Sequence, residues 1–407
     1  VLKSGRYAVL IIGDSVYNKV VYSGALSISE KAKNIGFKEI GIIEREIHKT
    51  KRSFVSAARR ATSEKLLILK KPEKNYFINL EKPPYNLWSY EEELSKREIK
   101  QFLNLNNQSN NKNLKIGPYI YPLAKKLVFT HYIDNSNTKE PTWQAILENG
   151  FAYQASARKD PKYITHGIHP YKGKFYPQLA KSLINLSGID TGANIFDPFC
   201  GSGTTLLEGY LNGHYTFGID MNPLAVKIAK AKVKILEINP DILRESISTV
   251  IKKIENSPSV FKNDREQFCE DSIDEIENWF SNKIINKLNW LLRILRSSSD
   301  GIILDFFEVI LSSIIREVSH QDPKDLRIRK RKEILEDADV ISLFFNQLET
   351  QVKRIEHFWS IRGYSPNKFC KSIIHDGDSR EWEKFEEVGL KKNKIDLVLT
   401  SPPYATA

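Results

Sequence analysis

With 407 residues, 41% of them hydrophobic, the chain can form two or three domains with substantial cores, which excludes wholesale disorder. No run approaches the roughly 18 uninterrupted apolar residues of a membrane span, and the first residues do not form a secretory signal, so we expect a cytoplasmic protein. The net charge of +11 favours an anionic partner such as a nucleic acid, although surface lysine also serves solubility alone.

The first part of the chain alternates between strand-like and helical patterns. Residues 7–13 form an apolar run typical of a buried parallel strand, and a helical stretch at 27–34 and an extended stretch at 39–47 follow. Residues 65–70 supply one more short strand. The expected order is strand, helix, strand, basic loop, strand.

Residues 72–150 are more polar, and residues 104–111 are too hydrophilic to pack a core. We therefore predict a polar linker here. One helix near 89–103 interrupts it, because Leu94, Ile99 and Phe102 would form an apolar stripe at helical spacing.

The second half of the chain predicts a parallel α/β sheet. Strand 193–197 leads into a Gly-rich turn and a helix, and strand 215–220 leads into another helix. Residues 239–369 have helical periodicity and are interpreted as a helical insertion. Residues 372–375 and 395–400 then read as the third and fourth strands.

The Gly-rich turn follows the strand that ends at Asp197 and has the form Asp-Pro-Phe-Cys-Gly-Ser-Gly-Thr. Gly201 and Gly203 would let the backbone approach a ligand closely, and the free amides of the following helix suit a carboxylate. Asp220 lies about 20 residues further on, where an acidic side chain can accept hydrogen bonds from both ribose hydroxyls of a nucleoside cofactor. Its alternative role is to cap the next helix.

The three cysteines, Cys200, Cys269 and Cys370, lie far apart and form no CxxC or Cys/His cluster. This spacing argues against disulfides and against a zinc site. His166 and His169 suggest metal ligands, but no third ligand is apparent. We expect reduced thiols and no bound metal.

A second motif, Thr-Ser-Pro-Pro-Tyr at residues 400–404, directly follows the fourth strand. Together with the Gly-rich turn it resembles the DNA amino-methyltransferases, the N-4/N-6 DNA methylase family. The resemblance implies a Rossmann-like methyltransferase sheet, S-adenosylmethionine (SAM) as cofactor, double-stranded DNA as substrate and a cognate restriction endonuclease as a candidate partner.

The resemblance also assigns residues. The segment 166–177 resembles the motif that closes over the methionine end of SAM, and Asp378 is placed to accept from the adenine amino group, although a simple turn is the alternative there. The expected cofactor-binding residues are Lys174, Phe175, Asp197, Phe199, Gly201, Gly203, Thr204, Asp220 and Asp378.

The expected catalytic residues are Ser401, Pro402, Pro403 and Tyr404. An exocyclic base nitrogen is a poor nucleophile, because its lone pair is delocalised into the ring. By resemblance, the Ser401 hydroxyl and the Pro402 carbonyl accept the amino hydrogens, and Tyr404 stacks on the extruded base.

Serine at the first motif position is commoner in the cytosine-N4 enzymes of the family, which favours N4-methylcytosine over N6-methyladenine. A tRNA guanosine-N2 methyltransferase and a noncatalytic DNA-binding subunit are the alternatives. Basic residues in the insertion are candidates for DNA phosphate contact, or else form a solvated charged helix. They are Arg327, Arg329, Lys330 and Arg331.

The resemblance also divides the chain. Residues 1–71 resemble the fifth to seventh strands of a methyltransferase sheet, 72–150 form the linker, and 151–407 form the SAM-binding domain, which breaks off after the Ser-Pro-Pro-Tyr motif. Both ends look cut. A circular permutant would pair residues 7–13 with 395–400 in one sheet, whereas a fused tandem, which we favour slightly, would not.

Overall fold

The computed structural model describes residues 2, 5–13, 15–17, 20–46, 63–71, 76–103, 111–117, 120–135, 138–148, 161–257, 265–322, 328–362, 370–381, 383, 386, 389–391 and 393–402. The chain divides into two compact units. The first comprises residues 1–80, 107–125 and 134–139, and the second comprises residues 81–106, 126–133 and 140–407.

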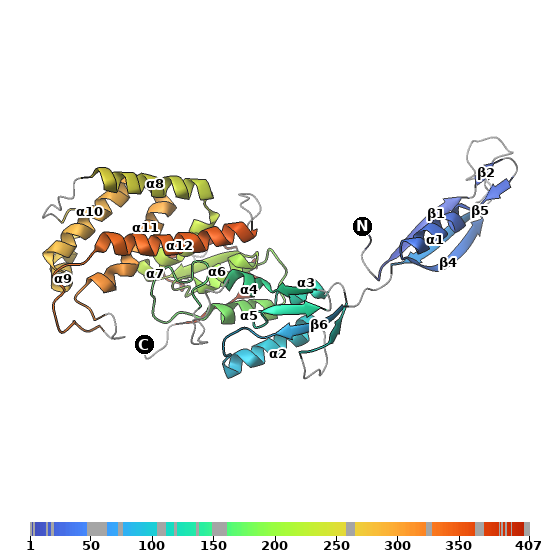
Figure 1. Ribbon diagram of the computed structural model, residues 1–407, viewed down its shortest axis with the longest axis horizontal. Helices are drawn as coiled ribbons and strands as arrows, with labels where there is room; N and C mark the ends of the chain where they lie inside the picture. The colour runs from blue at the N-terminus through green and yellow to red at the C-terminus, as the bar shows by residue number, and fades with distance from the viewer. Residues whose placement is uncertain are drawn as a thin grey trace. The chain divides into compact units, whose positions relative to one another are not determined.

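The first unit contains a three-stranded sheet with the order β1-β5-β4 (Figure 1). β1 (Tyr7–Gly13) and β4 (Lys38–Glu46) both pair antiparallel with the central β5 (Ser63–Lys70). The helix α1 (Gly24–Asn34) covers one face through a small core of Ala25, Ala32, Leu67 and Leu69. The strands and the helix expected near these positions are confirmed.

The expectation that residues 7–13 form a buried parallel strand is wrong. β1 is antiparallel to its neighbour, and Val9 and Ile11 are 57% and 61% exposed. Successive side chains of a strand point to opposite faces, and α1 covers only the face of Ala8 and Ile12. An apolar run in the sequence does not show whether other elements bury both faces of the strand.

The remaining elements of the first half are short. β2 (Ser15–Tyr17) and β3 (Val20–Tyr22) form an antiparallel pair, as do β6 (Tyr76–Glu81) and β7 (Leu114–Ile116). The chain continues with α2 (Ser89–Leu103), α3 (Tyr121–Ala124), β8 (Tyr132–Asn135), β9 (Thr138–Pro141) and α4 (Trp143–Glu148).

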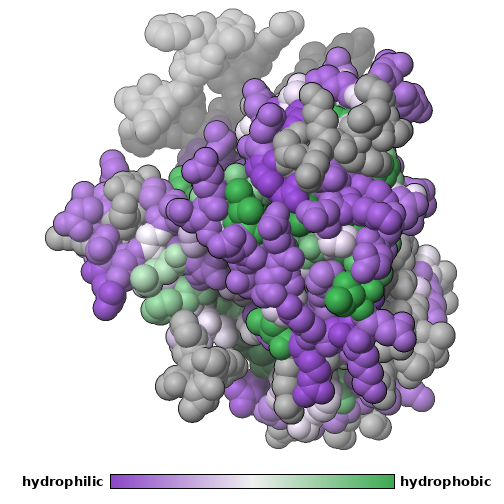
Figure 2. Space-filling model, turned by 90° about the vertical axis from the view of Figure 1, so that its left-hand side faces the viewer, coloured by the Kyte–Doolittle hydropathy of each residue, from purple (hydrophilic) through white to green (hydrophobic). Residues whose placement is uncertain are grey.

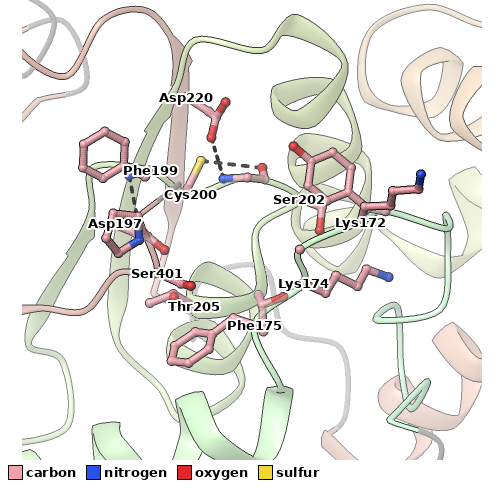
Figure 3. Close-up of a pocket in the computed structure, with 15 residues that line it drawn as sticks. Lys172, Lys174, Phe175, Asp197, Phe199, Cys200, Ser202, Thr205, Asp220 and Ser401 are labelled. Atoms are coloured by element: carbon pink, nitrogen blue, oxygen red, sulfur yellow. Dashed lines mark hydrogen bonds between the residues drawn. The ribbon is translucent and has the colours of Figure 1, made fainter. Parts of the chain in front are cut away.

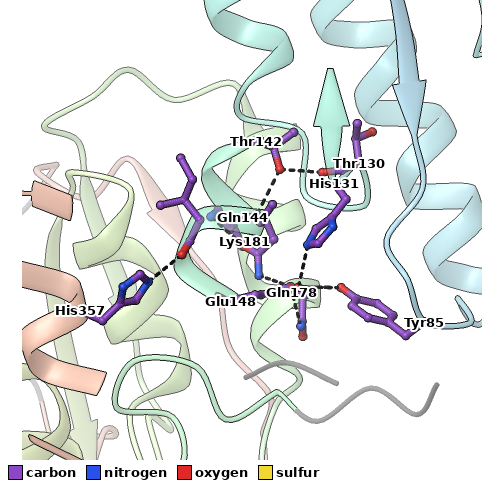
Figure 4. Close-up of polar contacts among 11 residues, drawn as sticks. Tyr85, Thr130, His131, Thr142, Gln144, Glu148, Gln178, Lys181 and His357 are labelled. Carbon is purple, nitrogen blue, oxygen red and sulfur yellow. Dashed lines mark hydrogen bonds and ion pairs between the residues drawn. The ribbon is translucent and has the colours of Figure 1, made fainter. Parts of the chain in front are cut away.

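Residues 72–150 are therefore more than a linker with one helix. The expected helix is present as α2, but other parts of the segment contribute to the core of the second unit. The Tyr85 hydroxyl donates to Glu148 over 3.1 Å, Gln144 donates to the same carboxylate over 2.7 Å, and buried Lys181 donates to Gln144 over 2.8 Å (Figure 4). Polar composition failed as a guide here because these polar groups are buried and satisfy one another.

The second unit is built on a parallel sheet with the order β12-β11-β10-β13. Its strands are β10 (Asn194–Asp197), β11 (Tyr215–Asp220), β12 (Ser372–Asp376) and β13 (Leu397–Val398). The helices around them are α5 (Pro177–Ser187), α6 (Thr204–Leu211) and α7 (Pro223–Lys234). The predicted parallel sheet with helices is confirmed.

The predicted helical insertion is also present. It contains α8 (Pro240–Asn256), α9 (Ile273–Trp279), α10 (Asn282–Ser298), α11 (Gly301–Val318) and α12 (Val340–Arg362), which lie together in Figure 1. Phe306 of α11 and Phe344 of α12 share one hydrophobic core with Leu206 of α6 and Val226 of α7. The insertion is thus packed on the sheet's helices, and its outer face is mostly hydrophilic (Figure 2).

Among the described helices, none is long and apolar enough to span a membrane. The tandem arrangement, in which residues 7–13 do not pair with residues 395–400, stays a prediction, and so does its alternative, the circular permutant in which they would pair.

Candidate cofactor and active site

A cavity of about 300 Å³ lies where β10 and β11 end. The two strands are parallel, so their carboxyl ends meet at one edge of the sheet, where ligands bind in open α/β folds. The cavity is lined by Tyr171, Lys172, Gly173, Lys174, Phe175, Asp197, Phe199, Cys200, Gly201, Ser202, Thr204, Thr205, Asp220, Ser401 and Pro402. In Figure 3, Asp220 lies at one end of the cavity, and Ser401 and Phe175 lie at the other.

The Gly-rich turn is held against the end of β11. The Gly201 amide donates to the Asp220 carboxylate over 2.8 Å, and the Cys200 amide donates to the Ile219 carbonyl over 3.0 Å. Gly201 has a φ of +49°, a backbone conformation that residues other than glycine rarely adopt. The turn is therefore fixed in a shape that keeps its backbone open to the cavity.

Gly203 has a different reason to be glycine. It has a φ of +77° and is the N-cap residue of α6, and it does not line the cavity. A Cβ atom at this position would lie 2.8 Å from the Cβ atom of Ala229 in α7. From the sequence, we predict that Gly203 lets the backbone approach a ligand closely. In the structure, the absence of a side chain at Gly203 lets α6 approach α7 closely.

The first turn of α6 has no capping side chain, because its N-cap residue is Gly203. The next helix differs, since the Asn222 side chain accepts from the amides of Leu224 and Ala225 at the start of α7. A helix N-terminus without a side-chain cap offers its amides, and the positive end of its dipole, to an anionic group.

Two carboxylates stand at the strand ends. Asp220 accepts from Gly201 and, over 2.9 Å, from Asn222, so it links the turn to α7 as well as lining the cavity. Asp197 is 3% exposed and accepts from the Phe199 amide over 3.1 Å. Burial raises the pKa of the Asp197 carboxyl above its usual value, while the ring of Phe199 remains 41% exposed.

The loop before α5 forms the wall of the cavity opposite the turn. The Lys174 ammonium donates to the carbonyls of His166 and His169 over 2.7 and 2.9 Å. This lysine therefore holds the loop in place beside Phe175, as well as lining the cavity. Tyr171 leans over the turn, with its ring 3.7 Å from where a Cβ of Gly201 would lie.

The same loop is anchored on a buried polar cluster. The Tyr163 hydroxyl and the His166 Nε2 both contact the Glu208 carboxylate of α6, over 2.5 and 2.7 Å. Burial lowers the pKa of His166 to about 4, so its imidazole is neutral near pH 7 and donates through Nε2. The Nδ1 and Nε2 atoms of His169 likewise contact Pro170 and Ser312 within the fold.

Both histidines thus have structural partners. Among the residues that the structure describes, no group of three or more His, Cys, Asp or Glu side chains is placed to hold a metal ion.

The structure brings Ser401 and Pro402 to the cavity from a segment about 200 residues after the Gly-rich turn. β13 pairs with β10 in parallel, through Ile195 with Leu397 and Phe196 with Val398, and so delivers the following residues to the same sheet edge. Pro403 and Tyr404 lie outside the described residues.

Asp378 does not line this cavity. It accepts hydrogen bonds from the backbone and the guanidinium of Arg380, and these hold the pKa of its carboxyl at about 2. The Gly377 amide donates to the Asp220 carbonyl over 3.1 Å, so the turn that contains Asp378 still lies beside the end of β11.

The basic residues of the insertion are partly engaged in the fold. Arg331 donates to the carbonyls of Ser319, Gln321 and Glu317 at the end of α11. Lys330 donates to Asn278 over 2.6 Å and lies over the Trp279 ring. Arg329 is exposed and Arg327 lies outside the described residues.

Sequence reasoning missed six residues that line the cavity as binding candidates. They are Tyr171, Lys172, Gly173, Cys200, Ser202 and Thr205. Their positions in the segment 166–177, and in or directly after the Gly-rich turn, were the available signal. Cys200, interpreted from the sequence as a packing residue, is 5% exposed, and burial raises the pKa of its thiol well above the usual value.

Two family models match the chain. A family model described as DNA methylase, for N6 and N4 methyltransferases, matches residues 1–231, and a methyltransferase-domain model described as RMKL-like matches residues 168–302. The first match covers more than half of the chain.

Among the relatives, the Type II methyltransferase M.MjaII of Methanocaldococcus jannaschii is 28% identical over 336 residues, covering 63% of this chain and 62% of that protein. M.MvaI of Kocuria varians is 27% identical over 285 residues, covering 67% and 59%. The chain thus spans about three fifths of the length of these curated relatives. A tRNA (guanine(10)-N2)-dimethyltransferase of Methanothermobacter thermautotrophicus matches over 78 residues only, at 36% identity, covering 19% of this chain and 21% of that protein.

A solved structure from Thermus thermophilus, described as a DNA modification methylase, is 17% identical and covers 57% of this chain and 73% of that one. The TM-score of this match is 0.15. The match over residues 1–231, together with the sheet-edge cavity that joins the Gly-rich turn to Ser401, leads to one conclusion: the chain belongs to the N6/N4 DNA methylase family.

Proposed function

We propose that this protein transfers a methyl group from SAM to an exocyclic amino nitrogen of a base in double-stranded DNA, with cytosine N4 as the favoured acceptor. The observation that carries the proposal is the shared cavity. Gly201 and Asp220 line the same space as Ser401, which lies about 200 residues after the Gly-rich turn. A cofactor site and an acceptor site must adjoin in this way for a direct transfer.

The residues present fit SAM. The uncapped amides at the start of α6 suit its carboxylate, and the Asp220 carboxylate at the opposite end of the cavity from Ser401 suits its ribose hydroxyls. The exposed ring of Phe199 offers an apolar surface to the adenine. When bound, SAM supplies an electrophilic methyl group.

The protein's own part in the reaction is to orient the amino group. The Ser401 hydroxyl and the Pro402 carbonyl would accept hydrogen bonds from its two N–H groups, which draws the nitrogen towards tetrahedral geometry and frees its lone pair. The nitrogen releases one proton once the methyl group has been transferred and the demethylated cofactor has left. The base would reach the cavity by leaving the DNA stack.

Cytosine-ring methylation requires a cysteine nucleophile. Cys200, which lines the cavity, is buried, and burial keeps its thiol protonated, so it is unsuited to attack on a base. We therefore favour amino methylation.

The choice of cytosine N4 over adenine N6 depends on Ser401 as the first residue of its motif. The relatives M.MjaII and M.MvaI are Type II methyltransferases, which supports DNA as the substrate and a cognate restriction endonuclease as a partner. The net charge of +11 is consistent with a polyanionic substrate.

A tRNA guanosine-N2 methyltransferase is the second candidate, since two such enzymes match short stretches of the chain. Each match covers less than a fifth of this chain, whereas the Type II enzymes match over 63% or more of it.

The test is to incubate the full-length protein with methyl-labelled SAM and either duplex DNA or tRNA, with the Ser401→Ala variant as control. The modified nucleoside is then identified by mass spectrometry. We expect N4-methylcytosine in DNA. N6-methyladenine in DNA would show that adenine, not cytosine, is the acceptor base. Methylation of tRNA would instead indicate the tRNA methyltransferase, and SAM binding without methylation of DNA or tRNA would indicate a noncatalytic subunit.

A further inference from the structure

A second cavity, of about 390 Å³, lies at the opposite edge of the same sheet. Two of its lining residues, Thr191 and Gly213, lie within three residues of the amino ends of β10 and β11. The cofactor residues follow the carboxyl ends. The second cavity is therefore separate from the site described above, although α6 runs from one to the other, with Thr204 lining the first and Leu211 the second.

The walls of this cavity are largely apolar. Trp143 and Leu147 come from α4, Leu211 comes from α6, and Phe358 and Ile361 come from α12. Trp143 is 48% exposed, so an aromatic face is available at this site, while Phe358 is 2% exposed and fixed in the core. A flat apolar molecule would find stacking and packing partners here.

The charged groups at the cavity have one sign. Its described lining residues include three cations, Lys126, Lys181 and Arg362, and no carboxylate. Lys181 is held by Gln144, close to the Glu148 carboxylate (Figure 4), so its charge is compensated within the fold. Lys126 and Arg362 thus leave the cavity electropositive.

Arg362 is pre-organised at this cavity. Its guanidinium lies 5.5 Å from the ring centroid of Tyr210 and 5.7 Å from that of Phe358, and it donates to the Tyr210 carbonyl over 3.3 Å. Burial lowers the pKa of Arg362, which reflects a cation partly removed from water. A desolvated, planar cation at an apolar site binds an anion more strongly than an exposed one does.

One more polar group lines the space. The Nδ2 atom of Asn212 is buried and makes no hydrogen bond to any described residue. A buried donor without an acceptor is costly, and a ligand oxygen would satisfy it.

We propose that this cavity is a second ligand site, for a small organic anion with a flat aromatic body and a carboxylate, sulfonate or phosphate head. The aromatic body lies against Trp143 and Leu147, and the anionic head meets Arg362, Lys126 and the Asn212 amide. The site does not depend on the proposed methyl transfer.

The test uses a matched pair of fluorescent probes, 8-anilinonaphthalene-1-sulfonate and its uncharged analogue N-phenyl-1-naphthylamine, titrated into the full-length protein. Arg362→Met removes the charge and keeps the apolar volume, and Leu147→Trp fills the cavity. Arg244→Met is the matched control, because Arg244 lies on α8 in exposed ion pairs with Asp241 and Glu356.

We expect Arg362→Met to weaken binding of the sulfonate about tenfold or more, as for a lost hydrogen-bonded charge, and to leave the uncharged probe within about twofold. Leu147→Trp should abolish binding of both probes, with circular dichroism unchanged, and SAM should displace neither. Sulfonate binding that is unchanged in Arg362→Met, equally weakened in Arg244→Met, or retained in Leu147→Trp would overturn the proposal. If Arg362→Met fails to fold, the Leu147→Trp titration decides alone.

Discussion

Replacing Gly203 with alanine should destabilise the second unit by an amount that follows from two costs. Alanine in the left-handed conformation, at a φ of +77°, costs about 1–2 kcal/mol. Its Cβ would lie 2.8 Å from the Ala229 Cβ and 3.1 Å from the Ala229 Cα, and overpacking of this kind costs about 1–3 kcal/mol. The free energy of unfolding should therefore fall by about 2–5 kcal/mol.

The assay is thermal unfolding followed by calorimetry. For a unit of this size, such a loss lowers the melting temperature by about 3–8 °C. Gly201→Ala is the matched control, since Gly201 also has a positive φ, but among the described residues its added Cβ would meet only Tyr171, at 3.7 Å. It should cost about 1–2 kcal/mol in stability but weaken SAM binding more than Gly203→Ala does, because Gly201 lines the cavity.

A double-mutant cycle identifies the cause. Ala229→Gly removes the atom that clashes most, at a helix-propensity cost of about 1 kcal/mol, so the double variant should be more stable than the sum of the single effects by about 1–2 kcal/mol. The rescue is partial, because the Ala229 Cα remains close. Effects that add within about 0.5 kcal/mol would refute a contact between α6 and α7 as the reason for Gly203.

Three further outcomes are expected. Ser401→Ala should abolish methyl transfer, while the affinity for SAM, measured by calorimetric titration, stays within about threefold. The reason is that Ser401 and Asp220 lie at opposite ends of the cavity. An equal loss of transfer and of SAM affinity would contradict these separate roles. His166 has a pKa of about 4 in the folded protein, against an ordinary value of 6.5. As the pH falls from 6.5 towards 4, this imidazole is protonated in the unfolded chain but not in the folded one, so the free energy of unfolding decreases. His166→Gln should remove up to about 1.4 kcal/mol per pH unit of that dependence in urea titrations, and an unchanged slope would show that His166 is not buried as a neutral group. Arg331→Met should lower the melting temperature, because it removes the hydrogen-bond donors to three carbonyls at the end of α11. It should leave the salt dependence of DNA binding unchanged. A weaker salt dependence at unchanged stability would instead indicate that Arg331 contacts DNA phosphates.

Much of the site was predictable because its residues lie in short motifs. The Gly-rich turn between a strand and a helix, and an acidic residue at the end of the next strand, are local patterns with a direct physical meaning. Of the expected residues, Phe175, Phe199 and Ser401 line the cavity together with Gly201 and Asp220.

Other assignments cannot be judged from local motifs, because they depend on distant contacts. Gly203 looks like a ligand-facing glycine until Ala229 is placed against it, and Arg331 looks like a phosphate contact until the carbonyls at the end of α11 are placed beside it. The polar segment 72–150 resembled a linker because its composition does not show that Glu148 and Gln144 would be buried with partners.

The sequence alone determined the parallel α/β sheet, the helical insertion and the pair of motifs, since each depends on periodicity or on neighbouring residues. Tertiary structure decided which polar groups are buried and which basic residues are held by the fold. It also placed Ser401 beside the Gly-rich turn, because the parallel pairing of β13 with β10 brings two strand ends about 200 residues apart to one edge of the sheet.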